Sequence, residues 1–135
     1  MNPKDTHDRG MKVRREVLGD EYVDAAVEKT TPFTADFQDF ITRYAWGEVW
    51  TRPALDRKTR SCISLTALMA RGHHEELGTH IEGALRNGLT EDEVKEVLLQ
   101  GAIYCGVPAA NAAFAVARSI LAGRSGGRGA GKQQE

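Results

Sequence analysis

Apolar residues recur with a helical period along most of this chain. Pro32 follows Thr31, a pairing typical of a helix start, and the aromatic and aliphatic positions after it repeat at i, i+4, i+7, i+8 and i+11. These positions are Phe33, Phe37, Phe40, Ile41 and Tyr44. The spacing predicts an amphipathic helix whose aromatic face is turned toward the core.

Glycine and capping residues divide the rest of the chain into helices. We expect a short helix from Arg9 to Leu18 that ends at Gly19, and a second helix capped by Asp20. Asp56 is placed to cap a further helix, which follows the aromatic one. This helix has no charge between Arg60 and Arg71, so we expect it to be buried on nearly all sides.

The C-terminal half carries the clearest helix boundaries. Asn87-Gly88 is a C-cap signal, and Thr90-x-x-Glu93 is a capping box that opens the next helix. Residues 97–117 carry no charge, and a bilayer span needs about 20 apolar residues. Turn residues divide this run and polar residues interrupt it, so we expect two helices and no membrane span. These residues are Gly106, Val107, Pro108, Gln100 and Asn111.

No stretch has the period of a strand, so the sequence predicts an all-α fold of about six to seven helices. We expect a flexible N-terminus over residues 1–8, a helical domain over 9–122 and a disordered Gly-rich tail over 123–135. The uncharged runs 61–70 and 97–117 exceed what one small domain readily hides, so we expect a homo-oligomer.

Charge and cysteine content narrow the function classes. Charged residues make up 27% of the chain and the net charge is −1, which provides no basic field for nucleic acid or anionic lipid. The first ten residues lack the apolar core of a signal peptide, which favours the cytoplasm. Cys62 and Cys105 lie singly in apolar runs and are expected to be buried, reduced and structural.

Most of the ionisable chemistry lies between Arg71 and Glu96. On a helix His73, Glu76 and His80 would share one face, while His74 would point elsewhere. A solvated helix surface explains His73 and Glu76 equally well. His80 precedes an apolar run, so it is expected at the edge of a buried stripe, where a polar side chain needs a reason.

A second cluster lies in the segment AWGEVWTRPALDRKTR. We interpret Glu48 to Leu55 as a connecting segment in which Glu48 is flanked by Trp46 and Trp50, with Arg52 close by. An ordinary loop with an aromatic anchor is the alternative.

A metal site and a cysteine nucleophile are both disfavoured. His73, Glu76 and His80 have a spacing that can converge on one ion, but the H-E-x-x-H pattern of zinc proteases is missing because Gly78 stands where the second histidine would be. Cys62 has no local group that would lower its pKa. We therefore expect no metal and no thiol chemistry.

Three segments carry a resemblance to a known family: WGEVWTRPALDRKTRS, RGHHEELGTHIEGALRNGLTEDEVKEVLLQ and YCGVPAANAAF. In this order and spacing they resemble the 4-carboxymuconolactone decarboxylase family, over roughly residues 8 to 122. The resemblance implies an all-helical AhpD-like fold, assembled as a trimer or hexamer. The redox branch of that superfamily carries C-x-x-C-x-x-x-H. Here its cysteine positions correspond to His73 and Glu76 and its histidine to His80, which disfavours peroxidase chemistry.

The resemblance also implies a reaction and a set of roles. The family removes a carboxylate from a dicarboxylate lactone in the protocatechuate branch of the β-ketoadipate pathway, and the substrate itself accepts the electrons, so no cofactor is implied. His80 is the implied proton donor or oxyanion partner, with Glu48 orienting it or acting as the acid. Candidate substrate-binding residues are Arg52, Arg57 and Arg60 as carboxylate clamps, Trp46 and Trp50 as walls, and His73 and Glu76.

Two alternatives to this function stay open. One is a related decarboxylase that acts on another lactone or β-keto acid. The other is a non-catalytic helical assembly protein of the same fold.

Overall fold

A computed structural model describes residues 2–128 of the chain. Over that range the chain forms seven α-helices and one π-helix and no strand, so the predicted all-α fold is confirmed. The chain divides into two compact units, Met1–Arg60 and Ser61–Glu135. Each unit has a buried apolar core of its own.

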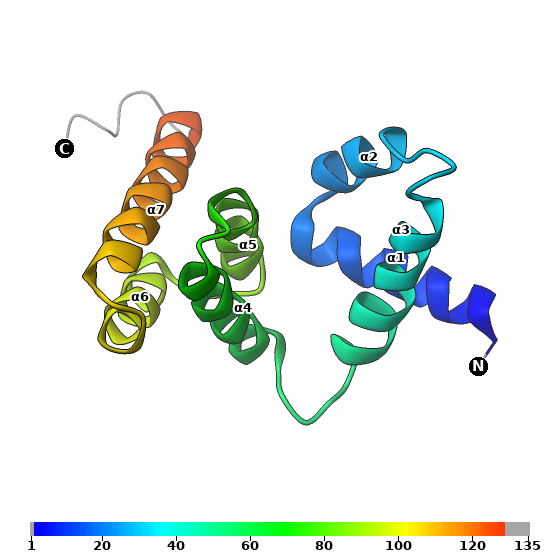
Figure 1. Cartoon of the computed structure of the whole chain (residues 1–135), viewed down its shortest axis with the longest axis horizontal. Helices are drawn as coiled ribbons and strands as arrows, with labels where there is room; N and C mark the ends of the chain where they lie inside the picture. The colour runs from blue at the N-terminus through cyan, green and yellow to red at the C-terminus, as the bar shows by residue number, and fades with distance from the viewer. Residues whose placement is uncertain (1, 129–135) are drawn as a thin grey trace. The chain divides into compact units, whose positions relative to one another are not determined.

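The N-terminal unit contains α1 (Pro3–Leu18), α2 (Asp20–Glu28), α3 (Ala35–Ile41) and the π-helix η1 (Thr42–Val49) (Figure 1). Helix α1 begins earlier than expected because the Asn2 side chain caps it: the Asp5 N–H donates to Asn2 Oδ1 at 2.9 Å. The predicted end at Gly19 is confirmed, with φ 92°. Asp20 is the first residue of α2 rather than its cap.

The core of the N-terminal unit does not include the aromatic face of α3. It is formed by Val13, Val17, Leu18, Val23 and Trp46. Phe33, Phe37, Phe40 and Tyr44 are exposed. The prediction that this face is turned toward the core is therefore wrong within the unit, because α1 and η1 already fill the space between themselves.

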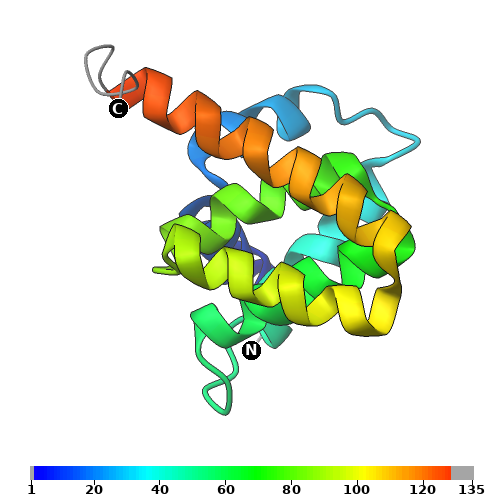
Figure 2. The ribbon, with the colours of Figure 1, turned by 90° about the vertical axis from the view of Figure 1, so that its left-hand side faces the viewer.

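The C-terminal unit holds most of α4 (Arg57–Arg71), followed by α5 (His74–Arg86), α6 (Glu91–Cys105) and α7 (Val107–Arg128). Figure 2 shows α7 returning along α6 after a sharp turn. The core draws on all four helices and the α5–α6 turn: Leu65, Met69, Leu77, Ile81, Ala84, Leu89, Val94, Leu98, Ala113 and Ala117.

The predicted caps and turns of this half are confirmed. The Thr59 N–H donates to Asp56 Oδ1 at 2.8 Å, and the Thr90–Glu93 capping box is present. Gly88 and Gly106 have φ values of 106° and 98°, a region that favours glycine. No helix in residues 2–128 is long and apolar enough to span a membrane. The cytoplasmic location stays a prediction.

Three expectations for the C-terminal half need correction. Helix α4 is not buried on nearly all sides, since Ile63 is exposed, and the uncharged end of α6 exposes Ile103 and Tyr104. Cys62 and Cys105 are free thiols but are half-buried rather than buried. Of the tail expected to be disordered, residues 123–128 belong to α7, and residues 129–135 lie outside the described residues.

Candidate functional site

Glu48 lies in the π-helix η1 and not in a connecting segment as expected. The wider turns of a π-helix join each N–H to the carbonyl five residues earlier, and the Trp50 N–H donates to the Ala45 carbonyl at 2.9 Å. Such segments are rare and frequently occur at functional sites. The Glu48 side chain is exposed on this segment, so its carboxylate is accessible.

The two tryptophans that flank Glu48 have different environments. Trp46 is buried in the core of the N-terminal unit, and Trp50 is half-buried. Their rings stack with centroids 4.9 Å apart and an interplanar angle of 26°. Trp46 therefore anchors η1, while the ring of Trp50 keeps an exposed portion beside the Glu48 segment.

Helix α1 holds η1 through its backbone, which the sequence analysis missed. A Cβ on Gly10 would collide with the Thr42 carbonyl and the Gly47 nitrogen, so the two helices cross at backbone contact distance. Beside this crossing, Arg9 Nε donates to the Gly47 carbonyl at 3.0 Å. The peptide that precedes Glu48 is thus fixed by residues of α1.

Arg14 is a second contact that the sequence analysis missed. It is buried, its Nη1 donates to Thr42 Oγ1 at 3.3 Å, and its Nε has no hydrogen-bond partner among the described residues. Burial lowers the pKa of this guanidinium. Its position between Val13 and Val17, on the apolar stripe of α1, is the sequence signal that could have revealed it.

The three candidate arginines differ in how they are engaged. Arg57 Nη2 lies 2.8 Å from Glu16 Oε1, so this guanidinium is already paired. Arg60 Nη2 donates to the Arg52 carbonyl at 3.0 Å, while its buried Nε lacks a partner in the described chain.

Arg52 lies at the start of the connector that follows η1 and is exposed. Within residues 2–128 no hydrogen bond or ion pair engages its guanidinium. Arg52 and the Nε of Arg60 are therefore the groups of this set best able to bind a carboxylate.

His80 lies on α5, one residue before the fully buried Ile81, as the sequence predicted for the edge of the stripe. The side chain is half-buried. Burial lowers the pKa of His80, and the charge of Glu76, one turn earlier on the helix, opposes this by favouring the protonated form. His80 is thus held neutral near pH 7 beside a carboxylate that can stabilise its protonated form.

His73 does not share the helical face of His80, so that expectation is wrong. Gly72 adopts φ 73° and ends the preceding turn, and His73 is the N-cap of α5 with non-helical angles. The exposed His73 ring accepts a long hydrogen bond from Arg71 Nε at 3.4 Å. Glu76 is exposed and lies on α5 one turn before His80, as expected.

His74 faces away from this group, as expected. It lines an open groove of about 480 Å³ between α5 and α7, together with Glu75 and Glu82. His80 does not line this groove. Over the described range, no group of three His, Cys, Asp or Glu side chains is placed to hold a metal ion.

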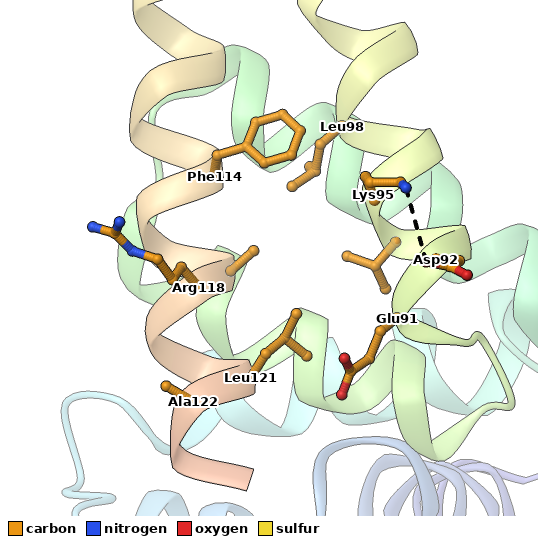
Figure 3. A pocket seen from close by; sticks show the side chains of 10 residues that line it. Glu91, Asp92, Lys95, Leu98, Phe114, Arg118, Leu121 and Ala122 are labelled. Atoms are coloured by element: carbon orange, nitrogen blue, oxygen red, sulfur yellow. Dashed lines mark ion pairs between the residues drawn. The ribbon is translucent and has the colours of Figure 1, made fainter. Parts of the chain in front are cut away.

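A further open groove of about 470 Å³ runs between α6 and α7 (Figure 3). Its walls are apolar, with Leu98 and Phe114 facing each other. The Glu91 carboxylate points toward Leu121, and Lys95 Nζ lies 3.8 Å from Asp92 Oδ1. The lining carries two acidic side chains, Glu91 and Asp92, and two basic ones, Lys95 and Arg118, so the groove offers no net positive charge to a dicarboxylate.

The candidate residues thus form two groups, one in each unit. The N-terminal group contains Trp46, Glu48, Trp50, Arg52, Arg57 and Arg60. The C-terminal group contains His73, Glu76 and His80.

Comparison with known proteins decides the family. The model of the carboxymuconolactone decarboxylase family matches residues 35–119. The chain belongs to this family. It is 44% identical over 121 residues to the 4-carboxymuconolactone decarboxylase of Acinetobacter baylyi, covering 90% of each chain. It is also 46% identical over 114 residues to the nitrosuccinic acid decarboxylase of Metarhizium robertsii, covering 84% of this chain and 80% of that one.

The match to the carboxymuconolactone decarboxylase family begins at Ala35, the first residue of α3. It therefore includes Glu48, the candidate arginines and His80, and leaves out α1 and α2. The match to the Acinetobacter baylyi protein is longer, at 121 residues. Helix α1 thus supports η1 from outside the segment that matches the family.

Proposed function

We propose that this protein converts 4-carboxymuconolactone to 3-oxoadipate enol-lactone in the protocatechuate branch of the β-ketoadipate pathway. The observation that carries the proposal is the 44% identity to the Acinetobacter baylyi enzyme over 90% of both chains. The exposed acid, the neutral histidine and the available arginines are the residue types that this reaction needs.

The substrate supplies its own electron sink. The bond between the γ-carbon and its carboxylate breaks, CO2 leaves, and the electron pair moves through the ring double bond onto the lactone carbonyl. A proton added to the α-carbon of the resulting dienolate gives the enol-lactone. The protein must therefore bind two carboxylates, stabilise the dienolate oxygen and deliver one proton.

His80 is the proposed proton donor. Burial keeps its imidazole neutral in the free protein near pH 7. A bound dianion would raise its pKa, as Glu76 already does in part, so that His80 takes up a proton from solvent when the substrate binds. The protonated imidazole then stabilises the dienolate and passes the proton to the α-carbon.

Glu48 is the proposed second acid–base group. It either assists the step that His80 carries out or delivers the proton itself. A double-mutant cycle with His80→Gln and Glu48→Gln decides whether the two act as a unit, because the rate losses of residues in one catalytic step do not add.

The carboxylate clamps are proposed to be Arg52 and Arg60. Arg52 is exposed, and the Arg60 Nε–H is buried without a partner in residues 2–128, so a substrate carboxylate would satisfy it. Arg57 is paired with Glu16 and is the weakest of the three candidates. Trp50 is proposed to shield the bound lactone, with Trp46 as its support.

We also propose that the protein is a homo-oligomer, either a trimer or a hexamer. The support is the amount of apolar surface that each chain exposes, including Phe33, Ile103 and Tyr104. Light scattering at micromolar concentration measures this directly, and a stable folded monomer would contradict it.

Decarboxylation of nitrosuccinic acid is a second candidate function. It is favoured by the 46% identity to the Metarhizium robertsii decarboxylase. The chemistry is related, because loss of CO2 from the carbon that bears the nitro group leaves its electron pair on that group as a nitronate. This substrate is also a dicarboxylic acid and would use the same clamps.

The test offers each acid to the purified protein and follows the products by NMR. Rapid formation of the enol-lactone, with slow or no loss of nitrosuccinic acid, supports the proposal. The opposite preference would contradict the proposal and support nitrosuccinic acid as the substrate. If the lactone is bound but lost slowly or not at all, the protein is a related decarboxylase that acts on another lactone or β-keto acid. If neither acid is bound, it is a non-catalytic helical assembly protein of the same fold.

A further inference from the structure

Four exposed aromatic side chains follow one another along the turn before α3, α3 itself and η1. We call this row the aromatic ridge; it consists of Phe33, Phe37, Phe40 and Tyr44, exposed by 96%, 60%, 53% and 45%. The rings of Phe40 and Tyr44 pack with centroids 5.0 Å apart, and the Arg43 guanidinium lies 5.1 Å from the centroid of Tyr44. Phe40, Tyr44 and Arg43 thus form a packed group within the row.

The area of the ridge is large enough to form the centre of an interface. Aromatic side chains carry roughly 150–250 Å² each, so the exposed fractions amount to about 500 Å² of apolar surface. A standard interface buries about 800 Å² on each partner. The ridge would therefore supply more than half of one side, with the aromatic residue types that dominate interface energetics.

The charges beside the ridge point to a protein partner. One flank carries Asp36, Asp39 and Arg43, and the other flank carries Thr34, Gln38, Ile41 and Ala45, which are uncharged. Asp39 is paired with Arg43 at 2.8 Å and lies 4.0 Å from His7 of α1. The flank thus offers no excess of basic side chains that would attract anionic lipid or nucleic acid.

We propose that the aromatic ridge packs against the same ridge of a second copy of this chain, antiparallel about a two-fold axis. The ridge positions are separated by four, three and four residues, a spacing that is the same in both directions. In the antiparallel pair Phe33 faces Tyr44 and Phe37 faces Phe40, so every ring meets a ring. The charged flanks also meet each other, which places Asp36 of one copy near Arg43 of the other.

This inference rests on the homo-oligomer proposed above and restricts its symmetry. A two-fold contact joins a residue set to itself, and a closed trimer has no two-fold axis. Of the trimer and the hexamer, the contact is compatible with the hexamer alone, built from three two-fold pairs.

The first experiment removes the centre of the ridge with Phe37→Ser and Phe40→Ser together. Since both side chains are exposed in the single chain, helix content by circular dichroism should be unchanged. The two-fold association should weaken on the order of 10³-fold, and sedimentation should give half the wild-type mass. Val27→Ser is the control, because Val27 is exposed by 50% on α2, outside the ridge.

The outcomes separate this proposal from the one on which it rests. A wild-type monomer would overturn both the homo-oligomer and the ridge contact. A wild-type oligomer whose mass survives the double substitution would overturn the ridge contact alone.

The second experiment tests the antiparallel register. Two proteins are prepared in a Cys62→Ala, Cys105→Ala background, one with Phe37→Cys and one with Phe40→Cys. Mixed and oxidised, they should form a disulfide-linked heterodimer several-fold faster than either protein forms a homodimer, because position 37 faces position 40. Equal rates for all three pairs, or no cross-link, would contradict the register.

Discussion

In the N-terminal unit Glu48 is carried by a π-helix that α1 holds through direct backbone contact, whereas in the C-terminal unit His80 is carried by a regular α-helix. At Gly10 the backbones of α1 and η1 are in contact, so a side chain cannot be added there unless one of the two helices moves. Helix α5 packs through side chains, with the fully buried Ile81 next to His80. The two proposed acid–base groups should therefore respond very differently to small changes beneath them.

The largest expected effect comes from replacing a buried glycine with alanine where the added Cβ meets the backbone of another helix. A glycine whose added Cβ meets only a side chain provides the comparison. Gly10→Ala places a Cβ against the backbone of Thr42 and Gly47, so we expect a loss of about 2–4 kcal/mol in the free energy of unfolding and a loss of activity. At Gly101 the added Cβ meets only the end of the flexible Met69 side chain. Gly101→Ala should cost less than about 1 kcal/mol, because the helix propensity of alanine offsets the repacking. Urea unfolding measures both, and equal losses would contradict the comparison.

Predictability from the sequence also differs between the units. The helix ends of the C-terminal half follow from local residues, since Gly88, Gly106 and the Thr90–Glu93 box act within one turn. The π-helix does not follow from local residues, because its support comes from Gly10 and Arg9, far away along the chain.

Hydrophobic patterning has a similar limit. The period of the aromatic residues predicted one amphipathic helix but gave no information about what covers its aromatic side chains, which are exposed in the single chain. Within the candidate site, His80 at the edge of the buried stripe was predictable from the apolar residues after it. His73 was not, because the turn at Gly72 removes it from the helix.

The next largest effect concerns the arginines of the N-terminal unit. Arg52→Gln should lower kcat/KM about 10- to 100-fold, the usual contribution of a charge-assisted hydrogen bond. Arg57→Gln should change kcat/KM by less than about threefold, because Arg57 is paired with Glu16. Initial rates over a range of 4-carboxymuconolactone concentrations measure both variants. The reverse order would move the clamp to Arg57.

A smaller effect tests the helix that follows the His80 helix. Thr90→Ala removes the capping box and should lower the free energy of unfolding by about 1 kcal/mol. Thr79→Ala is the control, because the Thr79 hydroxyl bonds the Glu75 carbonyl within its own helix and caps no N-terminus. If both variants lost the same stability, the cap would not be the cause.

The smallest effect is the dependence of stability on pH through His80. Because burial holds the pKa of His80 below its ordinary value of 6.5, the unfolded chain takes up a proton at higher pH than the folded chain. This contribution to stability is complete above about pH 6.5 and is lost as the pH falls toward the lower pKa of the folded state. His80→Gln should therefore gain stability relative to wild type as the pH is lowered from 7.5 to 5.5. A constant difference over this range would show that His80 is not buried in its neutral form.

The measurement that tests the account most directly is kcat on 4-carboxymuconolactone for His80→Gln and His74→Gln, made side by side. A general acid–base group contributes on the order of 10²–10⁴-fold to the rate. We predict that His80→Gln lowers kcat by at least 100-fold with the oligomer intact, and that His74→Gln, whose side chain lines the separate groove between α5 and α7, changes kcat by less than about twofold. Equal small losses in the two variants, or dissociation of the oligomer by His80→Gln, would contradict the catalytic role of His80.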